Sequence, residues 1–469
     1  MLKLYNSLSR EKEEFIPINE GKVGFYHCGP TVYWTQHIGN LRGMTCGDII
    51  VRTLRYLGYE VTHVRNYTDV GHLTSDSDQG EDKITKGVRR EGLNPSQLSQ
   101  KYIDIFENDT SAINLLEPTI KPKATEHIHD MINMVRTLLE KGYAYTTDLA
   151  VYFDVSKAKD YNALNRQKLE ELDEGAGKGD VSDPAKKHHA DFALWFFKAG
   201  VHKNALQYWT SPFHSPLVEH GEGFPGWHIE CSAMSKKYLG DTLDIHMGGI
   251  EHIPIHHTNE IAQSESANGA RFVNYWMHNA HLVVDNEKMA KSQGTSFSLS
   301  EITEKGFSPI VLRYFYLQAQ YRSAQNFTWD ALQAAQNGLD NIYNVVESLG
   351  KEMGDVDKRF KDKFIKALSD DFNTPVALSI FLDMLKSKIS NQDKLATALD
   401  FDKVLGLKLD DIINAAPISI PGEIQKIVDE RSAARKDKDF KKSDELRDLL
   451  KEKGYSVADT KDGQQVKKI

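Results

Sequence analysis

A chain of 469 residues is too long for one compact hydrophobic core, so we expect two to four domains. With 40% hydrophobic and 27% charged residues, it has the composition of an ordinary globular protein. The net charge of −9 argues against a general polyanion binder, and three cysteines cannot form a disulfide framework. We expect a cytoplasmic protein with no membrane contact, because the N-terminus lacks the apolar core of a signal peptide and no apolar run could span a bilayer.

The first part of the chain alternates strand and helix patterns. Residues 22–28 (KVGFYHC) are typical of a buried strand, apolar residues recur at helical spacing from Leu41 to Leu57, and EVTHVRNYTD resumes a strand pattern. Strand, helix and strand in about fifty residues predict a βαβ unit in a parallel sheet. Such sheets bind ligands at the carboxyl ends of their strands, which places Cys28 and His37 at the predicted crevice.

The next segments differ in pattern. Residues 96–142 predict two amphipathic helices, and YAYTTDLAVYFDV, which begins at Tyr143, predicts a short hairpin. We interpret 118–225 as an insertion in the nucleotide-binding domain. From about residue 300 onward the pattern is almost wholly helical, up to a linker at 414–422 that is rich in Pro and small residues.

The C-terminal tail has its own composition. After the linker we expect two helices and then a hairpin with its turn near Asp462 and Gly463. Residues 431–469 carry twelve Lys/Arg against eight Asp/Glu. This local positive charge fits either a solvated lysine-rich helix or a regional nucleic-acid contact.

Residues 224–260 carry potential metal ligands. Cys231 is followed by His256 and Glu260, which would share one face of a helix because they are four residues apart. A thiol, an imidazole and a carboxylate are zinc ligands, and a second thiol would complete a set of four. From the residues alone, that thiol is Cys28 or Cys46.

Two short motifs point to nucleotide chemistry. HIGN at 37–40 opens a helix after a strand and a turn, where backbone N–H groups and the helix dipole favour a triphosphate. KMAKS at 288–292 places two lysines on a loop, where their charge can stabilise a departing pyrophosphate. Each motif alone is weak, but together they indicate a nucleotide-activating enzyme.

The combination resembles the class I aminoacyl-tRNA synthetases, whose signatures are HIGH and KMSKS. CGPTVY at Cys28, PGWHIECSAMS at Cys231, HHTNEIAQSE and the terminal DFKKSDELRD narrow the similarity to the cysteinyl-tRNA synthetase family, over essentially the whole chain. The resemblance implies a Rossmann-type α/β catalytic domain with a connective insertion, then an α-helical bundle and a small C-terminal α+β anticodon-binding domain. The domains implied are catalytic (1–117 and 226–300), connective (118–225), stem-contact and helical-bundle (301–413) and anticodon-recognition (423–469).

The resemblance also implies the site. Zn²⁺ would be held by Cys28, Cys231, His256 and Glu260, which leaves Cys46 in the core. The remaining roles fall into three groups: catalytic His37, Asn40, Lys288 and Lys291; ATP-binding His37, Asn40, Gly248, Gly249, Glu251 and Lys291; and cysteine-binding Thr68, Trp227, His246 and His257. For Trp227 the alternative is core packing, and for His246 and His257 it is that they are polar residues satisfied near the metal.

Several positions depart from the family pattern. Asn40 replaces the second histidine of HIGH, and Ala290 replaces the serine of KMSKS. Met247 and Glu251 stand where the family has glycine and aspartate, and SPFHSPLVEHGEGFPGW differs before Trp227.

The implied function is an ATP-dependent ligase that activates L-cysteine, with Mg²⁺ on the triphosphate, and transfers it to the 3′ end of tRNA(Cys). We expect it to act as a monomer. One alternative is a related ligase that joins cysteine to a small amine, against which the tail from residue 414 argues. Another is a zinc hydrolase or structural zinc protein, which would need no KMAKS loop.

Overall fold

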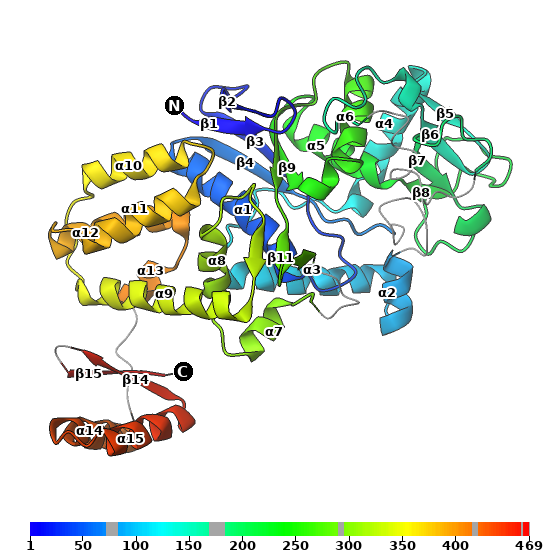
Figure 1. Cartoon of the computed structure of the whole chain (residues 1–469). Coiled ribbons are helices and arrows are strands. Elements are labelled where there is room, and N and C mark those ends of the chain that lie inside the picture. Colours follow the sequence, from blue (N-terminus) through cyan, green and yellow to red (C-terminus); the bar gives the residue numbers. More distant parts are fainter. Residues whose placement is uncertain (72–82, 168–182, 289–294, 415–420, 461–462, 469) are drawn as a thin grey trace. The chain divides into compact units, whose positions relative to one another are not determined.

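The computed structural model describes residues 1–71, 83–167, 183–288, 295–414, 421–460 and 463–468 (Figure 1). The chain divides into two compact units, Met1–Leu409 and Asp410–Ile469. Lys291 and Ala290 of the KMAKS motif lie outside the described residues. Within the described part of the chain, no helix is both long and apolar enough to cross a membrane.

The helices of the first unit are α1 (Ile38–Tyr56), α2 (Lys83–Glu91), α3 (Pro95–Ala112), α4 (Ile128–Glu140), α5 (Trp227–Leu239), α6 (His256–Asn268), α7 (Leu299–Glu304), α8 (Pro309–Leu317), α9 (Trp329–Ser348), α10 (Lys358–Leu368), α11 (Thr374–Lys386) and α12 (Asn391–Leu405). Its strands are β1 (Lys3–Asn6), β2 (Glu11–Glu14), β3 (Lys22–His27), β4 (Glu60–Arg65), β5 (Ala144–Thr146), β6 (Ala150–Phe153), β7 (Phe192–Phe197), β8 (Gly223–Pro225), β9 (Leu243–Gly249), β10 (Val273–Asn279), β11 (Leu282–Val284), β12 (Glu287–Lys288) and β13 (Gln325–Phe327). Helix α13 (Leu409–Asn414) spans the boundary between the units.

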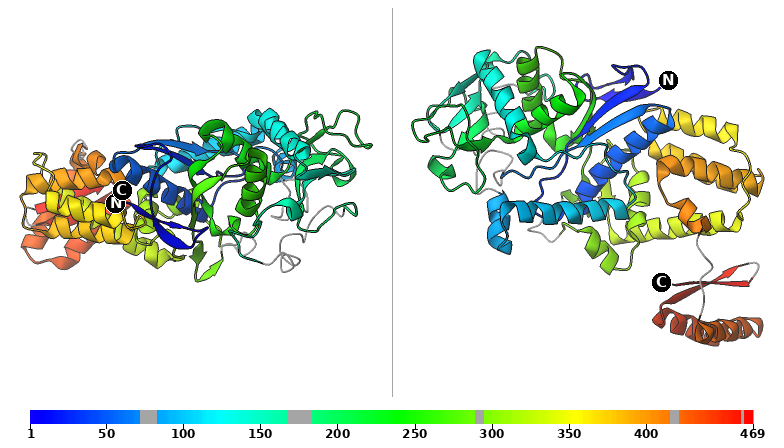
Figure 2. Two further views of the ribbon diagram at one scale, coloured as in Figure 1. Left: turned by 90° about the horizontal axis from the view of Figure 1, so that it is seen from above. Right: turned by 180° about the vertical axis from the view of Figure 1, so that it is seen from behind.

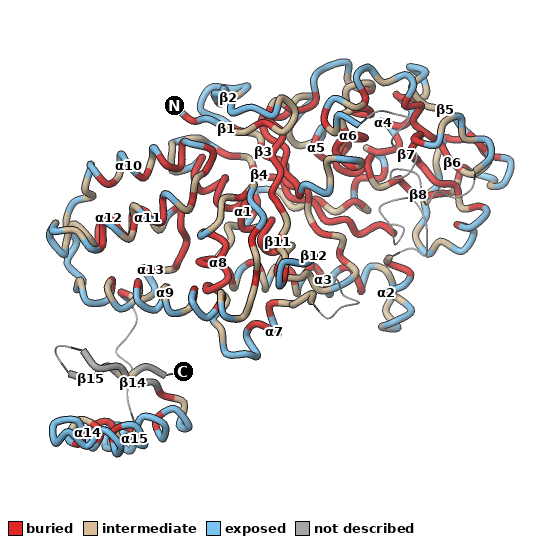
Figure 3. The backbone as a smooth tube through the Cα atoms, viewed as in Figure 1, coloured by how far each residue is buried: buried red, intermediate tan, exposed pale blue. Residues whose placement is uncertain are grey.

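A four-stranded parallel sheet with the order β10-β9-β3-β4 forms the centre of the first unit. Strands β3 and β4 flank α1, which confirms the predicted βαβ unit. Side chains alternate across β3: Phe25 shares an apolar cluster with Ile50 of α1, whereas Tyr26 belongs to a second cluster with Ile229 of α5. The sheet is therefore the middle layer of three, and its strands are among the most buried parts of the chain (Figure 3).

Helix α1 lies unusually close to the sheet at one point. A Cβ atom at Gly47 would come within 2.5 Å of the imidazole of His27 on β3, so only glycine allows this approach. The close packing fixes the helix that begins with the HIGN motif against the strand that ends just before Cys28.

Strands β5 to β8 form a separate antiparallel sheet in the order β5-β6-β7-β8. The pairing of β5 with β6 confirms the predicted hairpin. Phe153 and Trp195 of this sheet share one apolar cluster with Tyr26 of β3 and Ile229 of α5, so the segment is packed onto the parallel sheet and its helices. Helices α10 to α12 lie at the opposite end of the first unit, as the views from above and behind also show (Figure 2).

The second unit contains α14 (Gly422–Lys436), α15 (Phe440–Glu452), β14 (Tyr455–Thr460) and β15 (Gly463–Lys468). The antiparallel pairing of β14 with β15 confirms the predicted terminal hairpin, and the two helices are also as predicted. A small core of Ile424, Val428, Leu450 and Tyr455 joins these elements.

The KMAKS motif begins differently from the prediction. Lys288 was expected on a loop, but its backbone lies in β12, which pairs antiparallel with β11. The two connecting residues, Asp285 and Asn286, both have positive φ angles (50° and 66°), as a tight hairpin turn requires.

A buried ionic network joins α1 to α8 and to the C-terminal end of α12. Arg313 of α8 donates to the carboxylate of Asp48 (2.6 Å) and to the carbonyls of Leu405 (2.5 Å) and Asn114 (3.1 Å). Arg52 of α1 holds the same carboxylate at 2.8 Å. Burial alone would raise the pKa of Asp48, but the two guanidinium groups hold it below its ordinary value.

We expect Arg313→Met to lower the free energy of unfolding in urea by about 3–5 kcal/mol, because it leaves buried carbonyls and a buried carboxylate short of a donor. The matched control is Lys12→Met, which breaks an exposed pair with Asp370 and should cost about 0–1 kcal/mol. Equal losses for the two variants would show that the buried network contributes no more than a surface ion pair.

Candidate active site and metal centre

A cavity of about 410 Å³ opens at the carboxyl ends of the parallel strands. Its wall includes Cys28 after β3, Thr68 after β4, Gly248 at the end of β9 and Asn279 at the end of β10. The sequence placed the ligand crevice at this edge, and the cavity lies there. The other predicted site residues in its wall are His37, Asn40, Trp227, Cys231, Gly249, Glu251 and His256.

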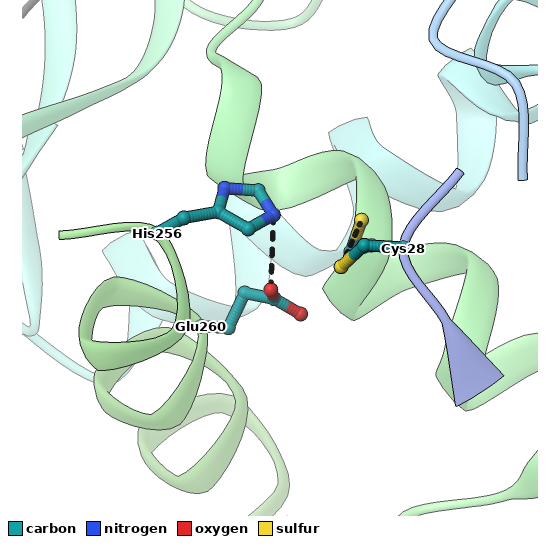
Figure 4. A group of neighbouring side chains, drawn as sticks. Cys28, His256 and Glu260 are labelled. Carbon is teal, nitrogen blue, oxygen red and sulfur yellow. Dashed lines mark hydrogen bonds and ion pairs between the residues drawn. The ribbon is translucent and has the colours of Figure 1, made fainter. Parts of the chain in front are cut away.

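The four predicted metal ligands lie together, and three of them, Cys28, Cys231 and His256, line this cavity. One ligand atom from each of Cys28, Cys231, His256 and Glu260 can be chosen so that all four lie within 4.8 Å of one another. The two sulfur atoms are 3.9 Å apart, and Nε2 of His256 is 3.0 Å from Oε1 of Glu260. His256 and Glu260 project from successive turns of α6 towards Cys28, as their four-residue spacing predicts (Figure 4).

The donor set fits a divalent metal ion. All four residues are buried, and the nitrogens that face Oε1 of Glu260, Nε2 of His256 at 3.0 Å and Nε2 of His257 at 3.8 Å, are not in hydrogen-bonding geometry. A buried carboxylate needs a cation or well-aligned donors beside it, and a metal ion would supply the cation. Two thiols, an imidazole and a carboxylate are the ligand types that zinc prefers.

Two of the four ligands are protonated near neutral pH and two are not. Burial alone would raise the pKa of Glu260, but the charges of His246 and His256 hold it at about 2. Hydrogen bonding to Cys28 lowers the pKa of Cys231 to about 7, whereas burial raises that of Cys28. Burial alone would lower the pKa of His256, but the charge of Glu260 raises it to about 10. A metal would therefore displace the protons of Cys28 and His256, because thiolate and neutral imidazole are the coordinating forms.

His246 and His257 lie behind the cavity wall and are fully buried. Nε2 of His257 is 3.4 Å from the sulfur of Cys28, and Nε2 of His246 is 3.0 Å from Oε2 of Glu260. With Cys28 and Glu260 they form a second group of four ligand atoms within 4.8 Å of one another. The structure thus places these two histidines against the metal ligands rather than in the described lining of the cavity.

Trp227 and Thr68 form other parts of the wall. The indole of Trp227 stacks on the imidazole of His256, with ring centroids 4.3 Å apart. The hydroxyl of Thr68 donates to the buried carboxylate of Glu230 at 2.9 Å. Trp227 is thus held by a predicted metal ligand, and Thr68 by the residue that precedes Cys231.

The predicted nucleotide-binding residues border the same space. A Cβ atom at Gly248 would lie 2.4 Å from the ring of His252, so glycine is required there. Glu251, with 48% of its side chain exposed, has Nδ1 of His281 3.6 Å from its carboxylate. His37 caps the N-terminus of α1, and its Nδ1 accepts a hydrogen bond from the backbone N–H of Asn40.

The sequence analysis missed two buried histidines next to the ligands. Nδ1 of His228 is 3.0 Å from Nδ1 of His256, and Nε2 of His278 is 2.7 Å from Nδ1 of His257. His228 precedes Cys231 by three residues on α5, a spacing that places both on one helical face, but no helix was predicted there from the sequence. His278 lies on β10, and no spacing relative to a ligand marks it.

Comparison with known protein families identifies the fold and its appended domains. Residues 14–337 match the model of the class I (C) tRNA synthetase catalytic domain, 363–409 match the DALR domain, and 419–466 match the cysteinyl-tRNA ligase anticodon binding domain. A cysteine–tRNA ligase of Treponema denticola is 44% identical, with 98% of both chains covered. Cysteine–tRNA ligase 1 of Burkholderia lata is 43% identical, with 99% of this chain and 96% of that one covered.

The chain belongs to the cysteine–tRNA ligase family. This confirms the resemblance and the predicted fold class, a parallel-sheet catalytic domain followed by helices and a C-terminal anticodon-binding domain. Solved class I synthetases share the fold. Methionyl-tRNA synthetase of Mycobacterium tuberculosis with methionyl-adenylate has a TM-score of 0.53 at 13% identity, covering 84% of this chain and 92% of that one. An Agrobacterium radiobacter LeuRS in complex with tRNA has a TM-score of 0.56 at 11% identity, covering 86% of this chain and 87% of that one.

Proposed function

We propose that this member of the cysteine–tRNA ligase family activates L-cysteine with ATP and transfers it to tRNA(Cys), and that Zn²⁺ at Cys28, Cys231, His256 and Glu260 selects the substrate thiol. The observation that carries the proposal is that three of these four ligands line the same cavity as the HIGN turn. A metal held by these ligands is then within reach of a small substrate that also contacts the nucleotide.

The four ligands give the site its selectivity. Zinc bound there would make a substrate thiol ionise and bind near neutral pH, whereas the hydroxyl of serine ionises far less readily and alanine offers no donor. A hydrophobic pocket distinguishes one methylene by only about 10–200-fold. Cys28 and Cys231, by presenting the metal to the cavity, would allow serine and alanine to be rejected without a second site.

The remaining side chains position the reactants. His37 donates from its imidazole to a phosphate oxygen, and the lack of a side chain at Gly248 and Gly249 allows ATP to approach the backbone. Lys288 and Lys291 stabilise the charge that develops on the departing pyrophosphate, with Mg²⁺ on the triphosphate. The cysteine carboxylate attacks the α-phosphate, which forms cysteinyl-adenylate and releases pyrophosphate. A hydroxyl at the 3′ end of the tRNA then attacks the cysteinyl carbonyl, which forms the ester and releases AMP. No side chain needs to act as a base in the first step, because the carboxylate is already ionised.

The direct test is pyrophosphate exchange in the presence of ATP and either cysteine or serine, followed by charging of tRNA(Cys) transcripts. We expect exchange with cysteine only, and charging of tRNA(Cys). Absence of cysteine-dependent exchange would refute the proposal, and exchange without charging would favour a ligase that uses a small amine acceptor. A purely structural metal is disfavoured because Cys28, Cys231 and His256 line an open cavity.

Because the chain folds as two compact units, we expect cysteine activation and tRNA charging to be separable by truncation. A chain that ends after Asn414 lacks the segment matched to the anticodon binding domain. We expect it to keep cysteine-dependent exchange within about threefold, while kcat/KM for tRNA charging falls by about 100-fold or more, because a second binding module is lost. A parallel loss of both activities would show that the second unit also supports the catalytic site.

A further inference from the structure

We propose that Asn40 is a positioning residue, whose side chain closes a reciprocal hydrogen-bonded pair with His37 and so fixes the imidazole that faces the nucleotide. This inference rests on the proposed function, in which His37 contacts ATP. Asn40, which replaces the second histidine of HIGH, would then orient His37 and would not itself contact the phosphates.

The pair is a capping box at the start of α1. The backbone N–H of Asn40 donates to Nδ1 of His37 at 3.2 Å, and the backbone N–H of His37 donates to Oδ1 of Asn40 at 3.2 Å. Asn40 is the third residue of the helix, the position from which a side chain reaches back to the residue before the helix. Its carbonyl oxygen is therefore used inside the protein.

This geometry sets the tautomer of His37. A backbone N–H can only donate, so Nδ1 of His37 must be the acceptor, and in the neutral ring Nε2 carries the hydrogen. His37 lines the cavity, where an Nε2–H group can donate to a phosphate oxygen. The opposite tautomer would present an acceptor to a phosphate, which also accepts, and would repel it.

Other backbone groups at the start of α1 already have hydrogen-bond partners within the protein, which makes the Nε2–H donor of His37 more important. The N–H of Ile38 donates to the carbonyl of Phe297 at 2.8 Å, and the N–H of Asn40 is occupied by His37. The hydroxyl of Tyr316 donates to the carbonyl of Ile38 at 2.7 Å. Two of the first backbone N–H groups of α1 thus already donate within the protein. A phosphate at the start of this helix would therefore be bound largely by the imidazole of His37.

The test compares Asn40→Ala with Asn40→Gln in cysteine-dependent pyrophosphate exchange. Glutamine is a usual capping-box residue at this position, so it restores the reach-back bond while moving the amide NH₂ by one methylene. We expect Asn40→Ala to lower kcat by about 10–100-fold, with a smaller change in KM for ATP, because the imidazole is no longer held in the reactive geometry. Asn40→Gln should recover to within about threefold of the parent enzyme.

Two results would overturn the proposal. If Asn40→Gln is as slow as Asn40→Ala, the cap is not what the asparagine supplies. If either variant raises KM for ATP with kcat unchanged, the amide itself binds the nucleotide.

A second readout does not depend on activity. In ¹⁵N–¹H spectra of histidine-labelled protein, the signals missing from His37→Gln belong to His37. We expect the parent protein to show Nδ1 as the unprotonated nitrogen and Asn40→Ala to show a mixture of tautomers, with Asn40→Gln like the parent. A parent enzyme with no cysteine-dependent exchange would refute the proposed function, whereas Nδ1 found protonated in the parent protein would refute this inference.

Discussion

Cys231→Ala is expected to remove bound zinc and to lower cysteine-dependent pyrophosphate exchange by about 1,000-fold or more. The substitution takes one of two sulfur ligands from a buried set of four. The remaining three ligands would bind the metal weakly, and without it the substrate thiol loses the partner that distinguishes it from a hydroxyl. Zinc content measured by atomic emission, together with the exchange rate, checks this prediction.

The matched control is Cys46→Ala. Cys46 is also buried, but it packs in the apolar cluster of α1 and belongs to neither group of potential ligands. This variant should keep about one zinc per chain and retain its exchange activity. If Cys231→Ala keeps its full zinc content, the prediction is wrong. The ion would then be bound by the second group of potential ligands, Cys28, His246, His257 and Glu260.

Lys291→Ala is expected to lower kcat for pyrophosphate exchange by about 100–1,000-fold, because the proposed function assigns this lysine the stabilisation of the charge that develops on the pyrophosphate. Lys291 itself lies outside the described residues. Of its neighbours on the chain, Lys288 of β12 pairs with Val283 of β11, and the carbonyl of Phe297 accepts a hydrogen bond from the N–H of Ile38 in the HIGN turn.

The control for Lys291→Ala is Ala290→Ser, which restores the family residue at the adjacent position and should change kcat by no more than about twofold. KM for cysteine should stay close to that of the parent enzyme in both variants, because the thiol site is untouched. If the two variants have the same kcat, the charge of Lys291 has no part in activation.

Features encoded by local periodicity were predictable. The βαβ unit followed from the alternation of strand and helix patterns around Leu41–Leu57, and the His256–Glu260 pair followed from four-residue spacing on a helix. The second thiol did not follow from the residues alone. Cys28 and Cys231 are 203 positions apart, and only the family resemblance preferred Cys28 over Cys46.

The sequence patterns could not predict contacts between residues that lie far apart in the chain and belong to no motif. The approach of His246 and His257 to the metal ligands depends on the register of β9 against β3 and on the packing of α6, neither of which leaves a periodic signal. The short β11–β12 hairpin was missed because the KMAKS motif, which begins at Lys288, was interpreted as a loop. The roles of individual site residues remain predictions until the variants are measured.

Both backbone polar groups of Ile38 have partners: its N–H donates to the carbonyl of Phe297, after the KMAKS motif, and its carbonyl accepts from the hydroxyl of Tyr316 on α8. One residue of the HIGN turn thus contacts both the segment that follows the lysine motif and helix α8. A ligand that shifts the Phe297 segment alters the first of these hydrogen bonds, and one that shifts α8 alters the second. If nucleotide moves one segment and tRNA the other, the two affinities are thermodynamically linked, and whatever factor tRNA imposes on ATP binding, ATP must impose equally on tRNA binding.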